Sequence, residues 1–246
     1  MIPRRSTGNL MLTLVLYSKG MTARFHRRLG PPTRLRAAAR GAALVLGFLV
    51  GLLGEALAAD SAHLYPKLFG TNETRSDNIK TFPKWTDMLS RHNSEQKRGD
   101  PPCTPTRFSR CSVADWLAFL EGERRKDRSA QMTDVNAFLN LHPYILDKLN
   151  YWQTPREFAM HDGDCKDYAI AKYFSLKFLG WQDDELRVVV VQDLNLRVAH
   201  AVLAVYINDA IMILDNQARQ VVRADNIRHY QPYYSINETS WWLHKP

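Results

Sequence analysis

Apolar residues recur at helical spacing in three stretches of the chain. In the first, positions 113–120 follow the i, i+3, i+4, i+7 pattern of an amphipathic helix, with Ser112 as its N-cap. The second stretch, 132–139, predicts a helix that ends near His142, because Pro143 disfavours a helical conformation in the residue before it.

The third stretch begins at Cys165. Ala169, Tyr173 and Leu176 lie at i, i+4 and i+7, and Gly180 is a typical residue to follow a helix C-terminus. We therefore predict a helix of about four turns from Cys165 towards Gly180.

Residues 60–112 are polar and rich in turn formers. They predict irregular structure, with a candidate helix around 85–89. The charge run 121–128 predicts a solvated face or a loop.

Beyond Gly180 the pattern changes to short β-branched runs. The predicted strands cover 187–192, 198–207, 211–214 and 221–222. Strands that follow helices and are joined by short turns indicate an α+β fold with an antiparallel sheet.

The composition is that of a globular protein, with 45% hydrophobic and 24% charged residues among 246. It excludes a largely disordered or collagen-like chain. The formal charge is +8, from 33 Lys+Arg and 25 Asp+Glu, but nine of the basic residues and one acidic residue lie in 1–58. The remaining 24 of each give residues 59–246 a net charge of zero, so we expect no nucleic-acid partner.

Residues 21–58 have the organisation of a secretory signal. Six arginines precede a short apolar stretch, 42–53, and Ala56-Leu57-Ala58 is an A-x-A cleavage site. The alternative is an uncleaved membrane anchor, but the stretch is well short of the roughly 20 apolar residues that span a bilayer. We therefore predict 1–58 to be a signal region with Met21 as a candidate start, and 59–246 to be a single exported domain without a membrane anchor.

Three cysteines remain in the predicted mature chain. An odd number in an exported protein leaves one thiol unpaired. Cys103 and Cys111 flank a Pro/Thr-rich loop and are candidates for a small disulfide ring, although two free thiols fit the spacing equally well. Cys165 is then the unpaired cysteine.

Cys165 opens its predicted helix directly after Gly163-Asp164. The free N–H groups and partial positive charge of a helix N-terminus favour a thiolate, and the same N–H groups can stabilise an oxyanion. Because Ala169 is four residues further on, the sulfur lies on the apolar stripe and should face the sheet.

His200 and Asp215 lie on two neighbouring predicted strands. Positions 200 and 215 are symmetrical about the Asn208-Asp209 turn, so in a hairpin they lie opposite each other or one pair removed. A carboxylate there would orient an imidazole base, and with Cys165 the pair would form a Cys-His-Asp triad. Each residue also has a structural alternative: a buried cysteine, a core histidine and a turn-forming aspartate.

Several segments, in order, resemble the bacterial transglutaminase-like cysteine proteinases, whose best-known members are the LapG-type adhesin proteases. The segments are YWQTPREF at 151–158, GDCKDYAIAKY at 163–173, RVVV at 187–190, HAVL at 200–203, LDN at 214–216, YSIN at 234–237 and Trp241-Trp242. The likeness covers roughly residues 80–244.

The resemblance implies a papain-like or transglutaminase-like fold, with the nucleophile helix packed on an antiparallel sheet. Cys165 would be the nucleophile, His200 the general base and Asp215 its orienting group. The enzyme would be periplasmic and would cut a large surface adhesin near its N-terminus, at a di-alanine site, which would release the adhesin and disperse biofilm. An inner-membrane cyclic-di-GMP receptor would sequester the protease through its periplasmic domain.

The family also binds calcium beside the nucleophile, through acids of an Asp-Cys-Glu-Asp stretch. Asp164 and Asp167 match this stretch, but Lys166 stands where the family has glutamate. Calcium takes six to eight oxygen ligands, and an ammonium group nearby opposes it. The alternative roles are an N-cap for Asp164 and a first-turn acid on the helix dipole for Asp167.

Two further expectations concern aromatic residues. The C-terminal aromatics, from Tyr230 to Trp242, are expected to pack on the core, and Trp152 is a candidate for the substrate groove. Two other functions fit the same residues: a transglutaminase that uses an amine acceptor, and an exported interaction module with a silent site.

Overall fold

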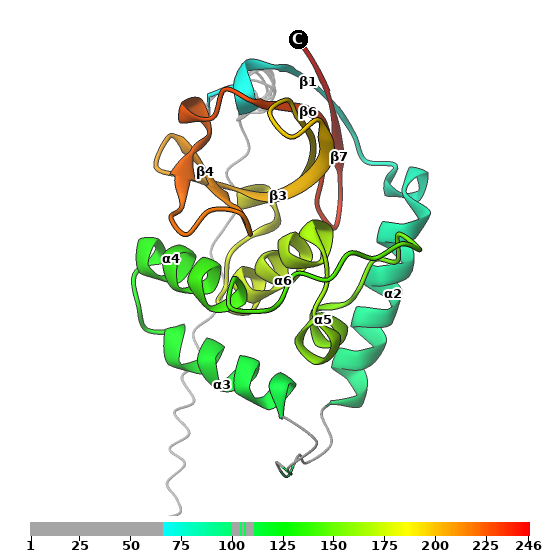
Figure 1. The fold of residues 1–246 in the computed structure, drawn as a ribbon, viewed down its shortest axis with the longest axis vertical. Coiled ribbons are helices and arrows are strands. Elements are labelled where there is room, and N and C mark those ends of the chain that lie inside the picture. The colour runs from blue at the N-terminus through cyan, green and yellow to red at the C-terminus, as the bar shows by residue number, and fades with distance from the viewer. Residues whose placement is uncertain (1–65, 100–103, 105, 107–110) are drawn as a thin grey trace, which may run out of the picture. The chain divides into compact units, whose positions relative to one another are not determined.

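Seven strands form one antiparallel sheet in the part of the chain that the computed structural model describes, residues 66–99, 104, 106 and 111–246 (Figure 1). The strand order is β1-β7-β6-β2-β3-β4-β5. The strands are β1 Asn72–Ser76, β2 Leu186–Asp193, β3 Val198–Ile207, β4 Ala210–Leu214, β5 Val222–Arg223, β6 Tyr230–Ile236 and β7 Trp241–Lys245. The predicted signal region, 1–58, lies outside the described residues.

Helices cover one face of the sheet. Those described are α2 Pro83–Arg98, α3 Ser112–Glu123, α4 Arg128–Leu139, α5 Pro155–His161 and α6 Cys165–Phe178. The central helix, α6, packs on β2 and β3 and is flanked by α4 and α5 (Figure 1). This arrangement confirms the α+β prediction, with the helix that begins at Cys165 packed on an antiparallel sheet.

Alternate residues of β3 face opposite sides of the sheet. The odd-numbered positions from Ala201 to Val205 belong to the large core that α6 covers, whereas the even-numbered positions from Val202 to Tyr206 pack in a second cluster on the other face. His200 continues the even-numbered series. His200 lies near the start of β3, within hydrogen-bond reach of Cys165 at the start of α6.

The strand predictions are close to the observed bounds. Strand β3 has the predicted limits, β2 and β5 differ from the predictions by one residue at both ends, and β4 differs by one residue at its start only. Asn208 and Asp209, at the predicted turn, both have positive φ, as expected for a two-residue hairpin turn.

The candidate helix predicted around 85–89 is confirmed as part of α2, whereas the prediction of irregular structure over 60–112 is wrong for the rest of α2 and for β1. The buried residues of α2 are Trp85, Met88, Leu89 and His92, at i, i+3, i+4 and i+7. A polar residue holds the last position, so the apolar period is visible over only about one turn. His92 is nevertheless buried and stacks on Phe174, with 4.1 Å between ring centroids.

Smaller differences concern helix ends and the charge run. Cys111, not Ser112, is the N-cap of α3, and Asp127 caps α4 by accepting a hydrogen bond from the Ala130 N–H. The run 121–128 is therefore partly helical at both ends. The prediction of a solvated face or loop agrees with the exposure of most of its side chains.

The C-terminal aromatics form β6 and β7, which the sequence pattern did not predict as strands. Tyr230 and Trp242 are buried, and Tyr234 and Trp241 pack against the large core, as expected. Tyr233 is the exception, because it is exposed on β6.

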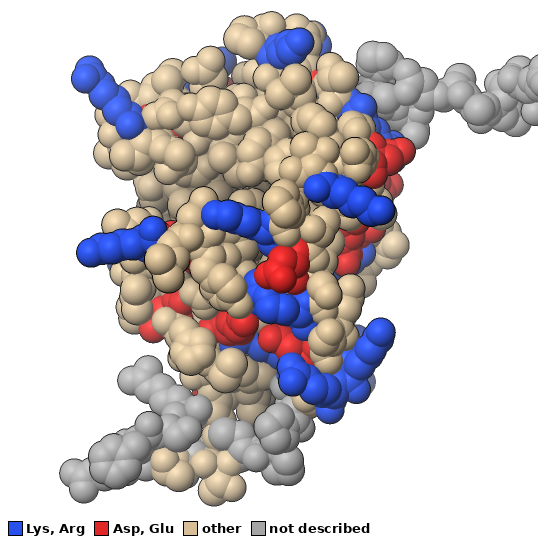
Figure 2. All heavy atoms as spheres, turned by 90° about the vertical axis from the view of Figure 1, so that its right-hand side faces the viewer, with Lys and Arg blue, Asp and Glu red and all other residues tan. Residues whose placement is uncertain are grey.

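The surface on the α2 side carries charges of both signs. Figure 2 shows Lys and Arg side chains interspersed with Asp and Glu side chains on this face, without one extended patch of a single sign. Within the described ranges, no helix has the length and apolar character needed to cross a membrane.

Candidate active site

Cys165 is the first residue of α6 and a free thiol, partly exposed to solvent. Asp164 caps the helix: its side chain accepts a hydrogen bond from the Lys166 N–H, and the Asp167 side chain accepts one from the Asp164 N–H. This reciprocal capping box fixes where the helix begins. It therefore also fixes the position of the sulfur at the helix N-terminus.

Gly163 precedes this cap at a point of close approach. A Cβ atom at Gly163 would lie 2.6 Å from Oδ2 of Asp167, closer than any ordinary contact. The same glycine carbonyl accepts a hydrogen bond from the Ile145 N–H, so a second segment is held beside the helix start. Only glycine fits between these two neighbours without a shift.

The β3–β4 hairpin brings His200 and Asp215 together. Leu203 pairs with Leu214, so Asp215 lies diagonally across from His200, as one of the two predicted arrangements requires. His200 Nε2 is 2.9 Å from Asp215 Oδ1, and both side chains are buried. The other ring nitrogen, Nδ1, lies 3.5 Å from Nε2 of the Gln217 side chain.

Charge interactions in this cluster favour a protonated His200. Burial by itself lowers the pKa of His200, but hydrogen bonds to Asp215 and to Cys165 outweigh it and raise the pKa to about 9. Burial likewise opposes ionisation of Asp215, yet the hydrogen bond from His200 and its charge lower the pKa of that carboxyl. The structure thus brings the three residues singled out in the sequence into one hydrogen-bonded cluster.

Three residues that support Asp215 were not identified from the sequence. The Tyr230 hydroxyl donates to Asp215 Oδ2 at 2.6 Å, the Gln217 N–H donates to Oδ1 at 2.9 Å, and Asn140 Nδ2 donates to the Asp215 carbonyl at 2.8 Å. Tyr230 was expected only to pack on the core. No local sequence signal links it to Asp215, because β6 reaches this site through the sheet.

Comparisons with known proteins identify the family of this chain. Residues 107–244 match the family described as bacterial transglutaminase-like cysteine proteinase. The chain belongs to this family. No curated protein matches the chain.

Solved structures of Legionella pneumophila LapG have the same fold as this cysteine proteinase. One is 28% identical with a TM-score of 0.53, covering 64% of this chain and 86% of LapG. A calcium-bound LapG is 30% identical with a TM-score of 0.52, over 64% of this chain and 86% of that one. An EGTA-treated LapG is 28% identical with a TM-score of 0.54, over 65% and 86%. The predicted transglutaminase-like fold and LapG-type family are thereby confirmed.

The calcium-bound and EGTA-treated LapG structures are consistent with calcium binding in this proteinase family, as the sequence suggested. In this chain, however, the Lys166 ammonium group lies between the predicted ligands. Its Nζ is 2.8 Å from Asp164 Oδ1 and 3.3 Å from Asp167 Oδ2. These residues do not fit a calcium ion while the lysine side chain occupies this position. Asp147, which the sequence pattern did not identify, contributes a third carboxylate.

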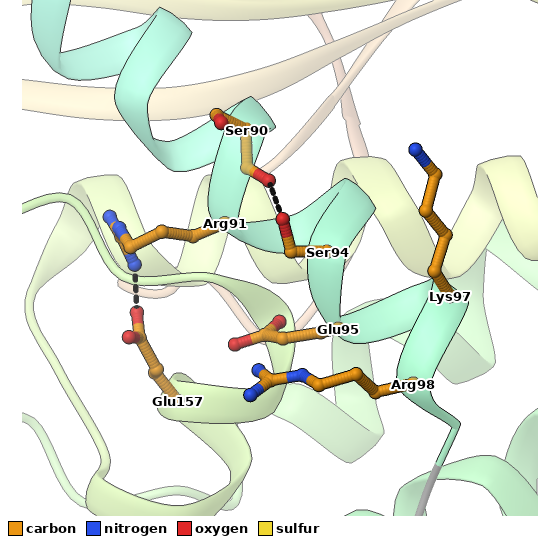
Figure 3. Close-up of a pocket in the computed structure, with 7 residues that line it drawn as sticks. All are labelled: Ser90, Arg91, Ser94, Glu95, Lys97, Arg98 and Glu157. Atoms are coloured by element: carbon orange, nitrogen blue, oxygen red, sulfur yellow. Dashed lines mark hydrogen bonds and ion pairs between the residues drawn. The ribbon is translucent and has the colours of Figure 1, made fainter.

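Trp152, the candidate groove residue, lies largely in the core of the proteinase. It is 8% exposed and makes an edge-to-face contact with Trp85. Its remaining surface lines a surface pocket of about 410 Å³ beside the start of α2. A second surface pocket, of about 460 Å³, lies between α2 and α5 (Figure 3). Neither pocket is lined by Cys165, His200 or Asp215.

Two of the three cysteines of the predicted mature chain lie in the described residues. Cys111 is disulfide-bonded, and Cys165 is free. Cys103, its predicted candidate partner, lies outside the described residues. The sulfur at the start of α6 is therefore available for chemistry.

Proposed function

We propose that Cys165, His200 and Asp215 form the catalytic triad of an endopeptidase. The observation that carries the proposal is the buried His200 Nε2–Asp215 Oδ1 contact of 2.9 Å, with a free thiol hydrogen-bonded to the same imidazole. An oriented imidazole beside a thiol at a helix N-terminus is the arrangement that activates a cysteine nucleophile.

In this mechanism His200 takes the thiol proton, and the Cys165 sulfur attacks the scissile carbonyl carbon. N–H groups at the start of α6 stabilise the resulting oxyanion. The C–N bond breaks as the imidazolium gives its proton to the leaving amine, which leaves a thioester on Cys165. His200 then removes a proton from water, the hydroxide attacks the thioester, and the carboxylate product leaves as the thiol is restored.

Apolar side chains beside the triad support a polypeptide substrate. Tyr144 and Ile145, which pair with Gly163, are exposed, and so is the following Leu146. On the other side of the site, Leu196 and Val198 are exposed just before His200. Burial, together with the charges of Cys165 and Asp164, raises the pKa of Tyr144, which places this side chain near the sulfur. Exposed apolar groups of this kind are typical of surfaces that bind polypeptides.

For the biological substrate we propose the N-terminal region of a large surface adhesin. Cleavage would release the adhesin and disperse biofilm, and the enzyme would act in the periplasm after removal of residues 1–58. An inner-membrane cyclic-di-GMP receptor would control it by sequestration through its periplasmic domain. The family and the likeness to Legionella pneumophila LapG support this proposal.

The decisive experiment mixes the purified mature chain, 59–246, with N-terminal fragments of candidate adhesins. We expect cut products from the wild type and none from Cys165→Ala, whose circular dichroism should be unchanged. Cleavage by the Cys165→Ala variant contradicts the assigned nucleophile. Incorporation of a labelled amine in place of water identifies a transglutaminase instead, and absence of thiol labelling at Cys165 favours the silent interaction module.

Localisation and control need separate measurements. Cell fractionation should find the mature form in the periplasmic fraction, and N-terminal sequencing should find residue 59 first. A purified periplasmic domain of the receptor should form a stable complex with the protease and stop cleavage. A precursor retained whole in the membrane, or a domain without effect on cleavage, contradicts these assignments.

A further inference from the structure

A buried lysine ammonium group lies among three carboxylates beside the nucleophile. Lys166 Nζ is 2.8 Å from Asp164 Oδ1, 3.3 Å from Asp167 Oδ2 and 3.4 Å from Asp147 Oδ2. The Lys166 side chain is 9% exposed, and that of Asp167 is fully buried. An ammonium group has three N–H donors, so the three carboxylates match its full donor capacity.

Moving the Lys166 ammonium group out of this cluster would be energetically unfavourable. A buried ion pair that loses one partner leaves an uncompensated charge in the interior. Here the loss would expose three carboxylates to one another at close range.

The same carboxylates hold the segment 147–153 against the start of α6. Asp147 accepts hydrogen bonds from the N–H groups of Leu149 and Tyr151, and Asp167 accepts one from the Gln153 N–H at 3.0 Å. Lys166 directly follows Cys165, so its ammonium group links the segment 147–153 to the start of α6.

A second anchor holds the segment from the side of α2. Arg91 donates to the Trp152 carbonyl oxygen and pairs with Glu157, the capping-box residue of α5. Figure 3 shows this Arg91–Glu157 contact between the two helices. Arg91 thus holds the segment at Trp152, and the Lys166 cluster holds it at Asp147.

We propose that the Lys166 ammonium group is a built-in cation that takes the place of calcium in this protein. Calcium takes six to eight oxygen ligands at about 2.3–2.6 Å, and its position between these carboxylates is occupied by Nζ. In the described part of the chain, no group of three or more His, Cys, Asp or Glu side chains is placed to hold a metal ion. The protein is therefore independent of calcium at this site.

The first test uses the wild-type mature chain and needs no substrate. The melting temperature, measured in excess calcium and in excess EGTA, should differ by less than about 1 °C, since a ligand that does not bind the native state does not stabilise it. Equilibrium dialysis with radioactive calcium should find no bound ion. One calcium bound per chain, or a clear fall of the melting temperature in EGTA, overturns the proposal.

The second test replaces the cation by a fourth carboxylate in Lys166→Glu. In EGTA we expect the melting temperature to fall by roughly 5–10 °C, because a buried ion pair loses its cation. Calcium should restore most of this loss and should bind with a stoichiometry of one. The control is Lys97→Glu, which makes the same charge change at an exposed position of α2 and should show no calcium dependence.

A Lys166→Glu variant that folds but neither binds calcium nor responds to it contradicts the proposal, because the vacated position should then accept a cation. If that variant does not fold in EGTA, refolding with calcium is the readout, and Lys166→Met should be destabilised in both media. Calcium binding by the wild type, and its melting temperature in calcium and in EGTA, test the proposal whatever the variants show. A chain that binds no calcium but cuts no adhesin fragment contradicts only the proposed substrate.

Discussion

Replacing Asp215 by asparagine removes the negative charge beside His200 and little else. The asparagine carbonyl oxygen can still accept the hydrogen bond that His200 Nε2 makes at 2.9 Å. The change therefore separates the charge of the orienting group from its geometry. Tyr230, which donates to Asp215 Oδ2, can rotate its hydroxyl to accept from the new amide.

The expected magnitude follows from the pKa of His200. Burial lowers this pKa, but Asp215 and Cys165 raise it from 6.5 to about 9. That difference corresponds to roughly 3 kcal/mol in favour of the imidazolium form. Because Asp215 provides the larger of the two contributions, we expect its neutralisation to remove about 2 kcal/mol and to bring the pKa of His200 below about 8.

The sign of the effect on stability is fixed by the raised pKa. A histidine whose pKa is higher in the folded state stabilises that state fully below pH 6.5, and this contribution is lost as the pH rises through about 9. The wild type should therefore lose up to about 3 kcal/mol between these pH values, and Asp215→Asn should lose less. The basic limb of the cleavage rate should move in the same direction, because His200 must hold a proton for the leaving amine.

The assay is a titration of the His200 imidazole by nuclear magnetic resonance, followed by urea unfolding across the same pH range. Asp209→Asn is the matched control, because it makes the same charge change at an exposed turn position of the same hairpin, with a positive φ that asparagine tolerates. The reasoning is refuted if His200 titrates at the same pH in wild type and Asp215→Asn, or near 6.5 in the wild type.

Three further variants test the surroundings of the site. Tyr230→Phe removes the 2.6 Å hydrogen bond to Asp215 and should cost about 1–2 kcal/mol in urea unfolding, with a several-fold slower cleavage. Gly163→Ala places a methyl group 2.6 Å from Asp167 Oδ2 and should cost about 1–3 kcal/mol and lower cleavage at least about tenfold. Lys172 is fully buried without a hydrogen-bond partner, and burial lowers its pKa to about 7 despite the opposing charge of Asp215. Lys172→Met should therefore stabilise the protein by roughly 4–5 kcal/mol at and below pH 7, and this gain should shrink as the pH rises towards 10.5.

Each of these variants has a contrary outcome. Unchanged stability of Tyr230→Phe would show that water replaces the hydroxyl group. A Gly163→Ala protein with wild-type cleavage would show that the helix start can move without harm to the nucleophile. A Lys172→Met gain that is equal at pH 7 and pH 10 would show that packing, not charge, limits stability at that position.

Local interactions made the parts of the fold that depend on few residues predictable. Helix α6 follows from apolar spacing within one segment, and the β3–β4 hairpin follows from two β-branched runs around Asn208-Asp209. The His200–Asp215 pair was accessible for the same reason, because a hairpin fixes which positions face each other.

Other elements carried a local signal that apolar spacing does not capture. Helix α5 has a capping box between Thr154 and Glu157 and a proline at its first turn, but it spans only seven residues. Helix α2 has a buried polar residue, His92, at the position that would have completed its apolar period. The capping box identifies α5 better than hydrophobicity does, whereas α2 has only Pro83 at its first turn as a start signal and no side-chain cap.

The sequence by itself determined α3, α4 and α6, the strands β2 to β5 and the pairing of His200 with Asp215, because these depend on interactions within a segment or across one tight turn. Only the tertiary structure decided that Cys165 meets this pair, that Tyr230 supports it from β6, and that Asp147 completes the cluster around Lys166. The path of loop 144–154 and the curvature of the sheet set these long-range contacts. They arise from the burial of many side chains at once, which no periodicity along the chain encodes.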